Sequence, residues 1–254
     1  MSTKKTLIET RNLTKQFGGL LAVDHVNYQL REGEIAGIIG PNGAGKTSFF
    51  NLLTGLFYPT EGQIYFQGKD ITKIPSHERV TMGLVRTFQL VSVFNSLTVL
   101  DNLILAHIRF GRHYTSKWEF FLSNAHSPDV LEACRETLNE VGLIEKENRM
   151  VSNLSYGDKR KLEIAIALSL RPKFLLFDEP FAGLSEGEID ELSKLINKIK
   201  NELSLIIIGH KISKIVNLVE KLSVMHKGQI IIEGNPNDVL NDCKVRQVYW
   251  HEGV

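Results

Sequence analysis

Residues 40–47 have the sequence GPNGAGKT, a complete match to the pattern G-x-x-x-x-G-K-[ST]. Residues 34–39 (EIAGII) come directly before it and form a nearly continuous apolar run, which is typical of a strand covered on both faces. We predict that a helix follows from Gly45 to about Gly55. A chance match to the pattern is expected in roughly 1 chain in 100 of this length. The strand before it and the helix after it favour a phosphate-binding loop over a chance glycine-rich turn.

The residues of this loop explain how it would hold phosphates. Its glycines let backbone N–H groups turn inward, and the helix that follows adds its positive N-terminal end. Lys46 supplies a point charge for the β- and γ-phosphates, and the hydroxyl of Thr47 can bind Mg²⁺. The predicted ligand is Mg-ATP, and the candidate nucleotide-binding residues are Gly40, Pro41, Asn42, Gly43, Ala44, Gly45, Lys46, Thr47 and Ser48.

A pair of acids ends a second apolar stretch, FLLFDEP at residues 174–180. In proteins with a phosphate-binding loop, we expect the strand beside the loop to deliver an acid that holds Mg²⁺. Asp178 fits that role, acting through water, and Glu179 would polarise the attacking water as a general base. The alternative is that the two acids merely begin a solvated turn. The buried type of strand before them favours the metal and base roles.

The overall composition is that of an ordinary globular protein. Of the 254 residues, 43% are hydrophobic and 23% charged, which suits one large domain or two small ones. Lys plus Arg number 30 and Asp plus Glu 29, so no basic field indicates nucleic acid or an anionic membrane as a partner. The two cysteines are far apart and are expected to be reduced thiols. The first ten residues lack the apolar segment of a secretory signal, and no apolar run reaches the roughly 18 residues that span a bilayer. We therefore expect a cytoplasmic chain.

The apolar pattern along the chain alternates between strand and helix signals. Strands are expected at 7–13 and 22–30 (with a turn at Gly18-Gly19), 34–39, 62–66, 174–177 and 205–208. Residues 98–142 are expected to form helices broken near Gly111 and at Ser127-Pro128, and further helices are expected at 129–141, 155–169 and 186–202.

These elements predict an α/β fold, a P-loop ATPase core with an N-terminal antiparallel β layer and an inserted helical subdomain. We expect a single domain over residues 1–254, in which 1–89 and 166–254 form the core with its β layer. The helical subdomain would cover about 90–165.

Residues 154–160, LSYGDKR, begin an amphipathic helix. Ser155 is a good N-cap and Gly157 exposes its backbone N–H, so this is a second helix N-terminus able to bind phosphate. Taken by itself, the segment fits an ordinary capped helix equally well.

The order of the motifs resembles that of the ATP-binding subunits of ABC transporters over nearly the whole chain. The matching features are the loop at 40–47, Gln89 after RTF, LSYGD at 154–158, DE at 178–179 and His210 after an apolar strand. The resemblance implies ATP hydrolysis, a dimer with a second identical or different ATP-binding subunit, and coupling to integral-membrane permease subunits. It also implies a peripheral position on the inner face of the cell membrane.

The resemblance assigns roles to five further positions. Phe17 resembles the aromatic residue that stacks on adenine, although it could be one more core Phe. Gln89 resembles the residue that senses Mg²⁺ and the attacking water, and His210 resembles the switch histidine that hydrogen-bonds the γ-phosphate. Ser155 and Gly157 resemble the residues that contact the γ-phosphate of ATP held by the opposite subunit. As single residues, Gln89 and His210 would look like solvated or structural side chains.

The chain departs from the usual family pattern at Tyr156, Asp158, Ser185, Gly209 and Lys211. These departures concern the rate of hydrolysis and the coupling between sites more than they concern ATP binding.

Several stretches resemble the importer subunits for branched-chain amino acids and the related urea importers. They are residues 86–103, the long insert before 138–143, LSYG, DEPFAGL at 178–184 and a tail ending VYWHEG. This resemblance implies import of a small polar solute, with a periplasmic or surface solute-binding protein in the full system.

Other functions remain open from the sequence. One is an exporter ATPase of the lipopolysaccharide-transport type, and another is a soluble ABC ATPase that acts on ribosomes or DNA. The latter usually has two cassettes or a long coiled-coil insert. A P-loop GTPase would need Asn-Lys-x-Asp, whereas residues 197–200 read NKIK and lack the acid.

Overall fold

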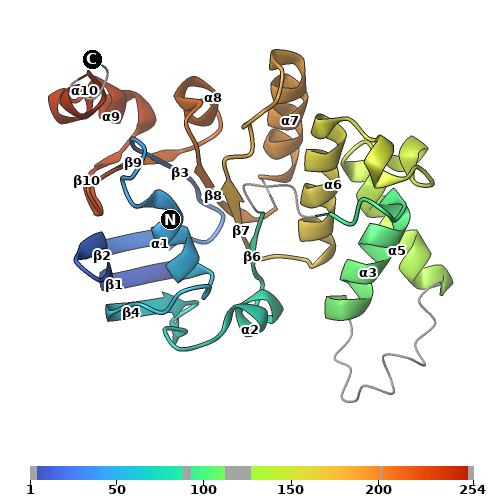
Figure 1. The fold of residues 1–254 in the computed structure, drawn as a ribbon, viewed down its shortest axis with the longest axis horizontal. Coiled ribbons are helices and arrows are strands. Elements are labelled where there is room, and N and C mark those ends of the chain that lie inside the picture. The colour runs from blue at the N-terminus through green and yellow to red at the C-terminus, as the bar shows by residue number, and fades with distance from the viewer. Residues whose placement is uncertain (1–4, 88–92, 112–126, 201, 251–254) are drawn as a thin grey trace.

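A computed structural model describes residues 5–87, 93–111, 127–200 and 202–250 of the chain. Two sheets and a group of helices make up the molecule (Figure 1). The first sheet is antiparallel, has the order β2-β1-β4-β5, and contains β1 (Thr6–Phe17), β2 (Leu20–Arg31), β4 (Glu61–Phe66) and β5 (Lys69–Asp70). It is the N-terminal β layer that the sequence predicts.

The second sheet has six strands in the order β10-β9-β3-β8-β7-β6. Its strands are β3 (Ile35–Ile39), β6 (Leu84–Arg86), β7 (Phe174–Asp178), β8 (Ser204–Ile208), β9 (Lys221–His226) and β10 (Gln229–Gly234). Neighbouring strands are parallel except for β10, which pairs antiparallel with β9 at one edge. One expectation is wrong: the strand that ends at Asp178 does not lie beside the strand that leads into the phosphate loop, because β8 lies between them.

The central strands are buried on both faces, as the apolar runs predict. Alternate residues of one strand belong to different cores, because successive side chains of a strand point to opposite faces. In β7, for example, Phe174 and Leu176 pack in the core toward the antiparallel sheet and helix α1 (Lys46–Leu53). Leu175 and Phe177 pack in the core that includes helix α7 (Glu186–Ile199).

The helical region lies to one side of the six-stranded sheet (Figure 1). Helices α3 (Val99–Gly111), α5 (Pro128–Glu140) and α6 (Tyr156–Ser169) pack on one another, and α6 also contacts α7. Two short 3₁₀ helices, Ile144–Lys146 and Val151–Asn153, connect α5 to α6. The remaining helices are α2 (Ser76–Thr81), α8 (Ile212–Val216), α9 (Pro236–Asn241) and α10 (Cys243–Trp250). The subdomain boundaries near residues 90 and 165 remain a prediction.

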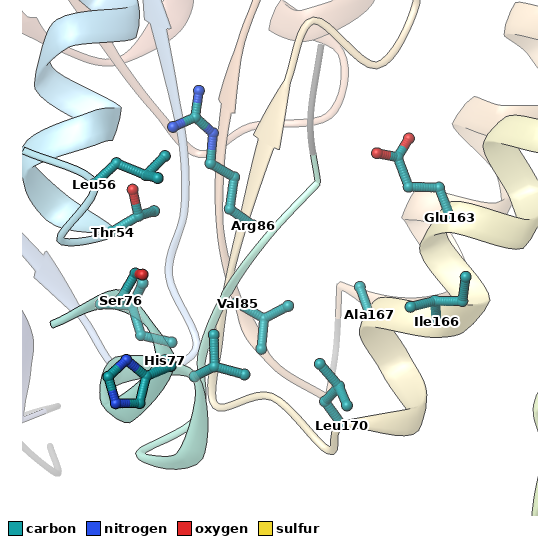
Figure 2. A pocket seen from close by; sticks show the side chains of 12 residues that line it. Thr54, Leu56, Ser76, His77, Val85, Arg86, Glu163, Ile166, Ala167 and Leu170 are labelled. Carbon is teal, nitrogen blue, oxygen red and sulfur yellow. The ribbon is translucent and has the colours of Figure 1, made fainter. Parts of the chain in front are cut away.

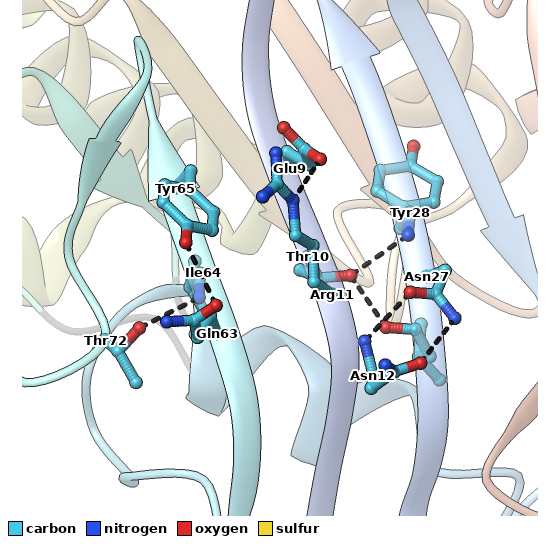
Figure 3. Close-up of polar contacts among 11 residues, drawn as sticks. Glu9, Thr10, Arg11, Asn12, Asn27, Tyr28, Gln63, Ile64, Tyr65 and Thr72 are labelled. Atoms are coloured by element: carbon cyan, nitrogen blue, oxygen red, sulfur yellow. Dashed lines mark hydrogen bonds and ion pairs between the residues drawn. The ribbon is translucent and has the colours of Figure 1, made fainter.

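Side-chain hydrogen bonds hold β1 and β2 together where their register is irregular. The register shifts between Thr10 and Leu13 of β1, which leaves ladder positions without backbone partners. The hydroxyl of Thr10 accepts the N–H of Tyr28 at 3.0 Å, and the N–H of Asn12 donates to the side-chain oxygen of Asn27 at 2.8 Å (Figure 3). These bonds give the backbone N–H groups of Tyr28 and Asn12 side-chain partners at the irregular positions.

Arg79 of α2 ties the end of α1 to the segment that follows β5. Its side chain is fully buried, and its guanidinium donates to five backbone carbonyls at 2.7–3.2 Å. The acceptors are Leu52, Leu53, Ile71, Thr72 and Ile74. Burial lowers the pKa of Arg79 to about 10, which still leaves it charged at neutral pH.

Arg79→Met should therefore lower the free energy of unfolding by about 3 kcal/mol or more, because the buried carbonyls lose their donors. Urea denaturation would measure this. The neighbouring exposed His77→Ala is the control and should change stability by about 0.5 kcal/mol or less. A loss below about 1 kcal/mol for Arg79→Met would mean that the carbonyls do not depend on Arg79.

Candidate nucleotide-binding and catalytic site

Parallel strands bring the predicted site residues to one edge of the six-stranded sheet. β3 leads into the loop at residues 40–47, β7 ends at Asp178, and β8 ends at Ile208, two residues before His210. The carboxyl ends of parallel strands lie at the same edge, which is where open α/β sheets bind their ligands. The sheet thus gathers residues that are up to 170 positions apart in the sequence.

The phosphate loop is held by close backbone packing against β2 and the β9–β10 hairpin. A Cβ on Gly45 would lie 2.3 Å from the carbonyl oxygen of Ala22, and Gly45 has φ +103°. The N–H of Gly228, in the hairpin, donates to the carbonyl of Ala44 at 2.9 Å. A side chain at position 45 would therefore force the loop away from its supports.

Lys46, the first residue of α1, is 6% exposed, and its ammonium lies beside the loop. It donates to the carbonyl oxygens of Gly40 at 2.7 Å and Pro41 at 2.9 Å. Burial lowers the pKa of Lys46, and the carboxylates of Glu179 and Asp178 oppose that shift. Lys46 and Glu179 line the same cavity although β8 separates the strands that lead to them.

Asp178 is 1% exposed, and one of its carboxylate oxygens, Oδ2, pairs with Nη2 of Arg86. Nη1 of Arg86 donates at 2.6 Å to the side-chain oxygen of Asn51 on α1. The other oxygen of Asp178, Oδ1, is buried without a hydrogen-bond partner among the described residues. A buried carboxylate oxygen of this kind is suited to a cation or to an ordered water.

Glu179 follows β7 in the left-handed backbone region, with φ +49°, and its N–H donates to the carbonyl of Ile208 at 2.9 Å. Left-handed conformations of residues other than glycine are uncommon and often occur at functional sites. Its Oε1 lies 2.9 Å from Nε2 of His210. The predicted base and the predicted switch histidine are therefore in direct contact.

The phosphate loop, Glu179 and His210 border a cavity of about 490 Å³. Residues 42–48 of the loop and helix, Glu179 and His210 all line it. Leu20, Leu21, Ala22 and Lys227 line it as well, and the sequence did not single them out. Their presence follows from the packing of β2 and of the β9–β10 hairpin against the loop, which no local pattern shows.

The other described candidate residues do not line this cavity: Gly40, Pro41 and Asp178 lie close to lining residues in the sequence, and Phe17 pairs with the lining residue Leu20. Phe17 is 41% exposed at the end of β1 and makes an edge contact with Phe57. Ser155 and Gly157 begin α6, where the hydroxyl of Ser155 accepts the N–H of Asp158 at 3.1 Å. Gln89 lies outside the described residues.

In the described part of the chain, no three His, Cys, Asp or Glu side chains form a metal-binding group. No described helix has both the length and the apolar character that a membrane span requires.

Comparisons with known proteins agree with this geometry. The ABC transporter family profile matches residues 23–182. The chain is 37% identical to the high-affinity branched-chain amino acid transport ATP-binding protein LivG of Salmonella typhimurium, over 97% of this chain and 98% of that protein. It is 34% identical to the lipopolysaccharide export system ATP-binding protein LptB of Acidithiobacillus ferridurans, over 96% of each. A solved ATP-binding cassette of an ABC transporter, in its ADP conformation, matches with a TM-score of 0.86 and 33% identity, over 96% of this chain and 98% of that one.

Proposed function

The chain belongs to the ABC transporter family as an ATP-hydrolysing subunit that works with membrane permease subunits, and on that premise we propose that it powers the import of branched-chain amino acids or a similar small polar solute. The observation that carries the hydrolytic part of this proposal is the contact of Glu179 with His210 on the cavity that the phosphate loop lines. The whole-length similarity to LivG supports the choice of solute. Export of lipopolysaccharide is the second candidate, supported by the similarity to LptB.

The site residues would divide the work of hydrolysis as follows. Lys46 and the N–H groups of the loop bind the β- and γ-phosphates. Glu179 accepts a proton from the attacking water, and His210 holds the Glu179 carboxylate in position and hydrogen-bonds the γ-phosphate. Phe17, on the exposed end of β1, would stack on the adenine ring.

The site fits a Mg²⁺ ion, which prefers oxygen ligands and usually binds through one or two protein groups plus phosphates and water. Thr47 lines the cavity, and Oδ1 of Asp178 is a buried oxygen without a partner among the described residues. Thr47 and Asp178, with Gln89 by resemblance, would hold the ion. Bound Mg²⁺ would withdraw charge from the β- and γ-phosphates.

We propose further that each ATP is shared between two chains. Ser155 and Gly157 lie on a helix N-terminus that does not line the cavity beside Lys46. Because the hydroxyl of Ser155 accepts the cap bond from Asp158, its own proton is available to a phosphate oxygen. In a head-to-tail dimer, whether of identical or different ATP-binding subunits, this N-terminus would contact the γ-phosphate held by the opposite chain.

A groove of about 280 Å³ between the core and the helical region is the proposed docking site for the permease (Figure 2). Leu56, after α1, and Ile166, on α6, line it from opposite sides, and Arg86 reaches it from β6 (Figure 2). Most of its surface is apolar, as a short amphipathic helix of a partner would require. Arg86 also pairs with Asp178, so it connects the groove to the proposed magnesium ligand. Docking here would place the chain on the inner face of the membrane, and a solute-binding protein would complete an importer.

Leu56→Asp tests this docking site. Leu56 is 49% exposed, so the substitution should leave the fold and the ATPase activity of the isolated chain intact. Recovery of the permease with the chain from native membranes should fall about tenfold, because the new charge would be buried in the interface. Leu105→Asp on α3, at 42% exposure and outside the groove, is the matched control.

Mass spectrometry of the recovered membrane protein would also identify the transporter class. A permease encoded beside a solute-binding protein supports import. Recovery of the chain with ribosomes or nucleoid alone, without a membrane protein, would contradict the proposal.

A further inference from the structure

Glu188, in the first turn of α7, joins two segments that follow different motifs. One of its oxygens, Oε2, accepts the backbone N–H of Ser185 at 3.0 Å and the Ser185 hydroxyl at 2.8 Å. The backbone N–H of Glu188 donates in return to the Ser185 hydroxyl at 3.4 Å, so the two residues form a capping box at the start of α7. They fix the end of the loop that begins at Glu179.

The second oxygen of Glu188 leaves its own helix and contacts α6. Oε1 accepts the backbone N–H of Gly157 at 3.1 Å. The same oxygen lies 2.6 Å from the position that a Cβ on residue 157 would take. The backbone of Gly157 does not have a positive φ, so its conformation does not require glycine. The absence of a side chain at this position instead allows Glu188 to approach.

A second close approach joins the same segments. The ring carbon Cε1 of Tyr156 lies 3.2 Å from the Cβ position of Gly183, in the loop between Glu179 and α7. The N-terminus of α6 and this loop therefore pack directly on each other at two points.

The N–H of Gly157 is one of the first-turn donors that have no partner within their own helix, which is why helix N-termini bind anions. A carboxylate oxygen now occupies this donor. The hydrogen bonds from Ser185 lower the pKa of Glu188, so its side chain is ionised at neutral pH. A γ-phosphate that approached Gly157 would meet a negative charge at the same N–H.

We propose that Glu188 regulates the shared ATP site by competing with the γ-phosphate of the opposite chain's ATP for the N–H of Gly157. This inference rests on the proposed function, in which Ser155 and Gly157 contact that phosphate. ATP-driven association releases Glu188 from Gly157. Because Glu188 also caps α7 through Ser185, the release loosens the connection between α6 and the loop that follows Glu179. The competition raises the ATP concentration that association requires. The release of Glu188 transmits binding at α6 to the loop beside the general base.

The test uses the hydrolysis-deficient Glu179→Gln chain and measures, by sedimentation velocity, the ATP concentration at half-maximal dimer formation. Glu188→Gln in this background removes the charge while its side chain keeps an oxygen acceptor of the same length. The midpoint should fall roughly three- to tenfold, because two partly screened charge repulsions disappear per dimer. Glu188→Ala, which also frees the N–H, should lower the midpoint at least as far, provided that thermal melting shows a folded chain.

Glu191→Gln is the matched control. Glu191 lies on the same helix and pairs with Lys161 of α6 at 2.6 Å, but it does not contact Gly157. It should leave the midpoint unchanged. A Glu188→Gln midpoint that equals the control or rises would overturn the proposal, since a purely structural role predicts weaker association. A Glu179→Gln parent that stays monomeric at every ATP concentration would contradict the sharing of ATP between two copies of this chain and the regulation with it.

Discussion

Lys46→Ala is expected to bind ATP at least about a hundredfold more weakly than the wild-type chain and to hydrolyse it at a rate close to background. Lys46 is 6% exposed, and its ammonium lies within the loop, where burial lowers its pKa. In this partly buried position its charge is screened less than a surface charge would be, so its loss is costly for the polyphosphate.

Isothermal titration with ATP and a phosphate-release assay would measure the two effects. Lys69→Ala, on the exposed strand β5, is the control and should change neither. Lys227→Ala would show how much an exposed cation on the same cavity contributes to ATP binding. The loss of affinity should be smaller than for Lys46→Ala, because water screens the charge of Lys227. A Lys46→Ala chain that hydrolyses ATP at the wild-type rate would refute the assignment of the phosphate loop.

Glu179→Gln is expected to retain ATP binding while its turnover falls by about 10²- to 10⁴-fold. The amide keeps the shape of the side chain and a hydrogen bond to His210, but it cannot accept the proton of the attacking water. Bound ATP should then persist and hold two chains together.

Size-exclusion chromatography with and without ATP would detect this dimer, and a phosphate-release assay would measure turnover. Glu61→Gln, on the antiparallel sheet, is the control and should behave as wild type. Normal turnover by Glu179→Gln would show that another group acts as the base.

The fold class and its family could be predicted from the sequence, and the structural matches confirm them. The reason is local: β3, the loop and α1 follow one another within 20 residues, and each has its own signal in apolar runs or glycines. The helix expected at 186–202 begins at Glu186 as predicted and ends at Ile199, three residues early. Helix ends are weakly specified, because the last carbonyls can find several partners.

The connections between motifs could not be predicted. Arg86 pairs with Asp178 across 92 residues, and Glu188 contacts Gly157 across 31. Neither contact leaves a periodic or compositional signal, because each depends on how distant elements pack. The prediction that β7 lies beside β3 is also wrong, because β8 lies between them. Strand order is set by the crossover connections and not by the apolar pattern of a strand.

The arrangement of the two helix N-termini carries the central claim, that the working unit is a dimer with each ATP between two chains. Consider Lys46→Ala and Ser155→Arg made in separate chains. On this claim each homodimer would have two damaged sites, because every site would take Lys46 from one chain and Ser155 from the other. In a mixed dimer both lesions fall in one site, and the other site is intact.

The decisive measurement is the ATPase rate of the two purified variants, alone and mixed in equal amounts. Each variant alone should be inactive, and the mixture should regain about a quarter of the wild-type rate, since random pairing makes half of the dimers mixed and each has one intact site of two. A Ser155→Arg chain that hydrolyses ATP by itself at the wild-type rate would contradict the account.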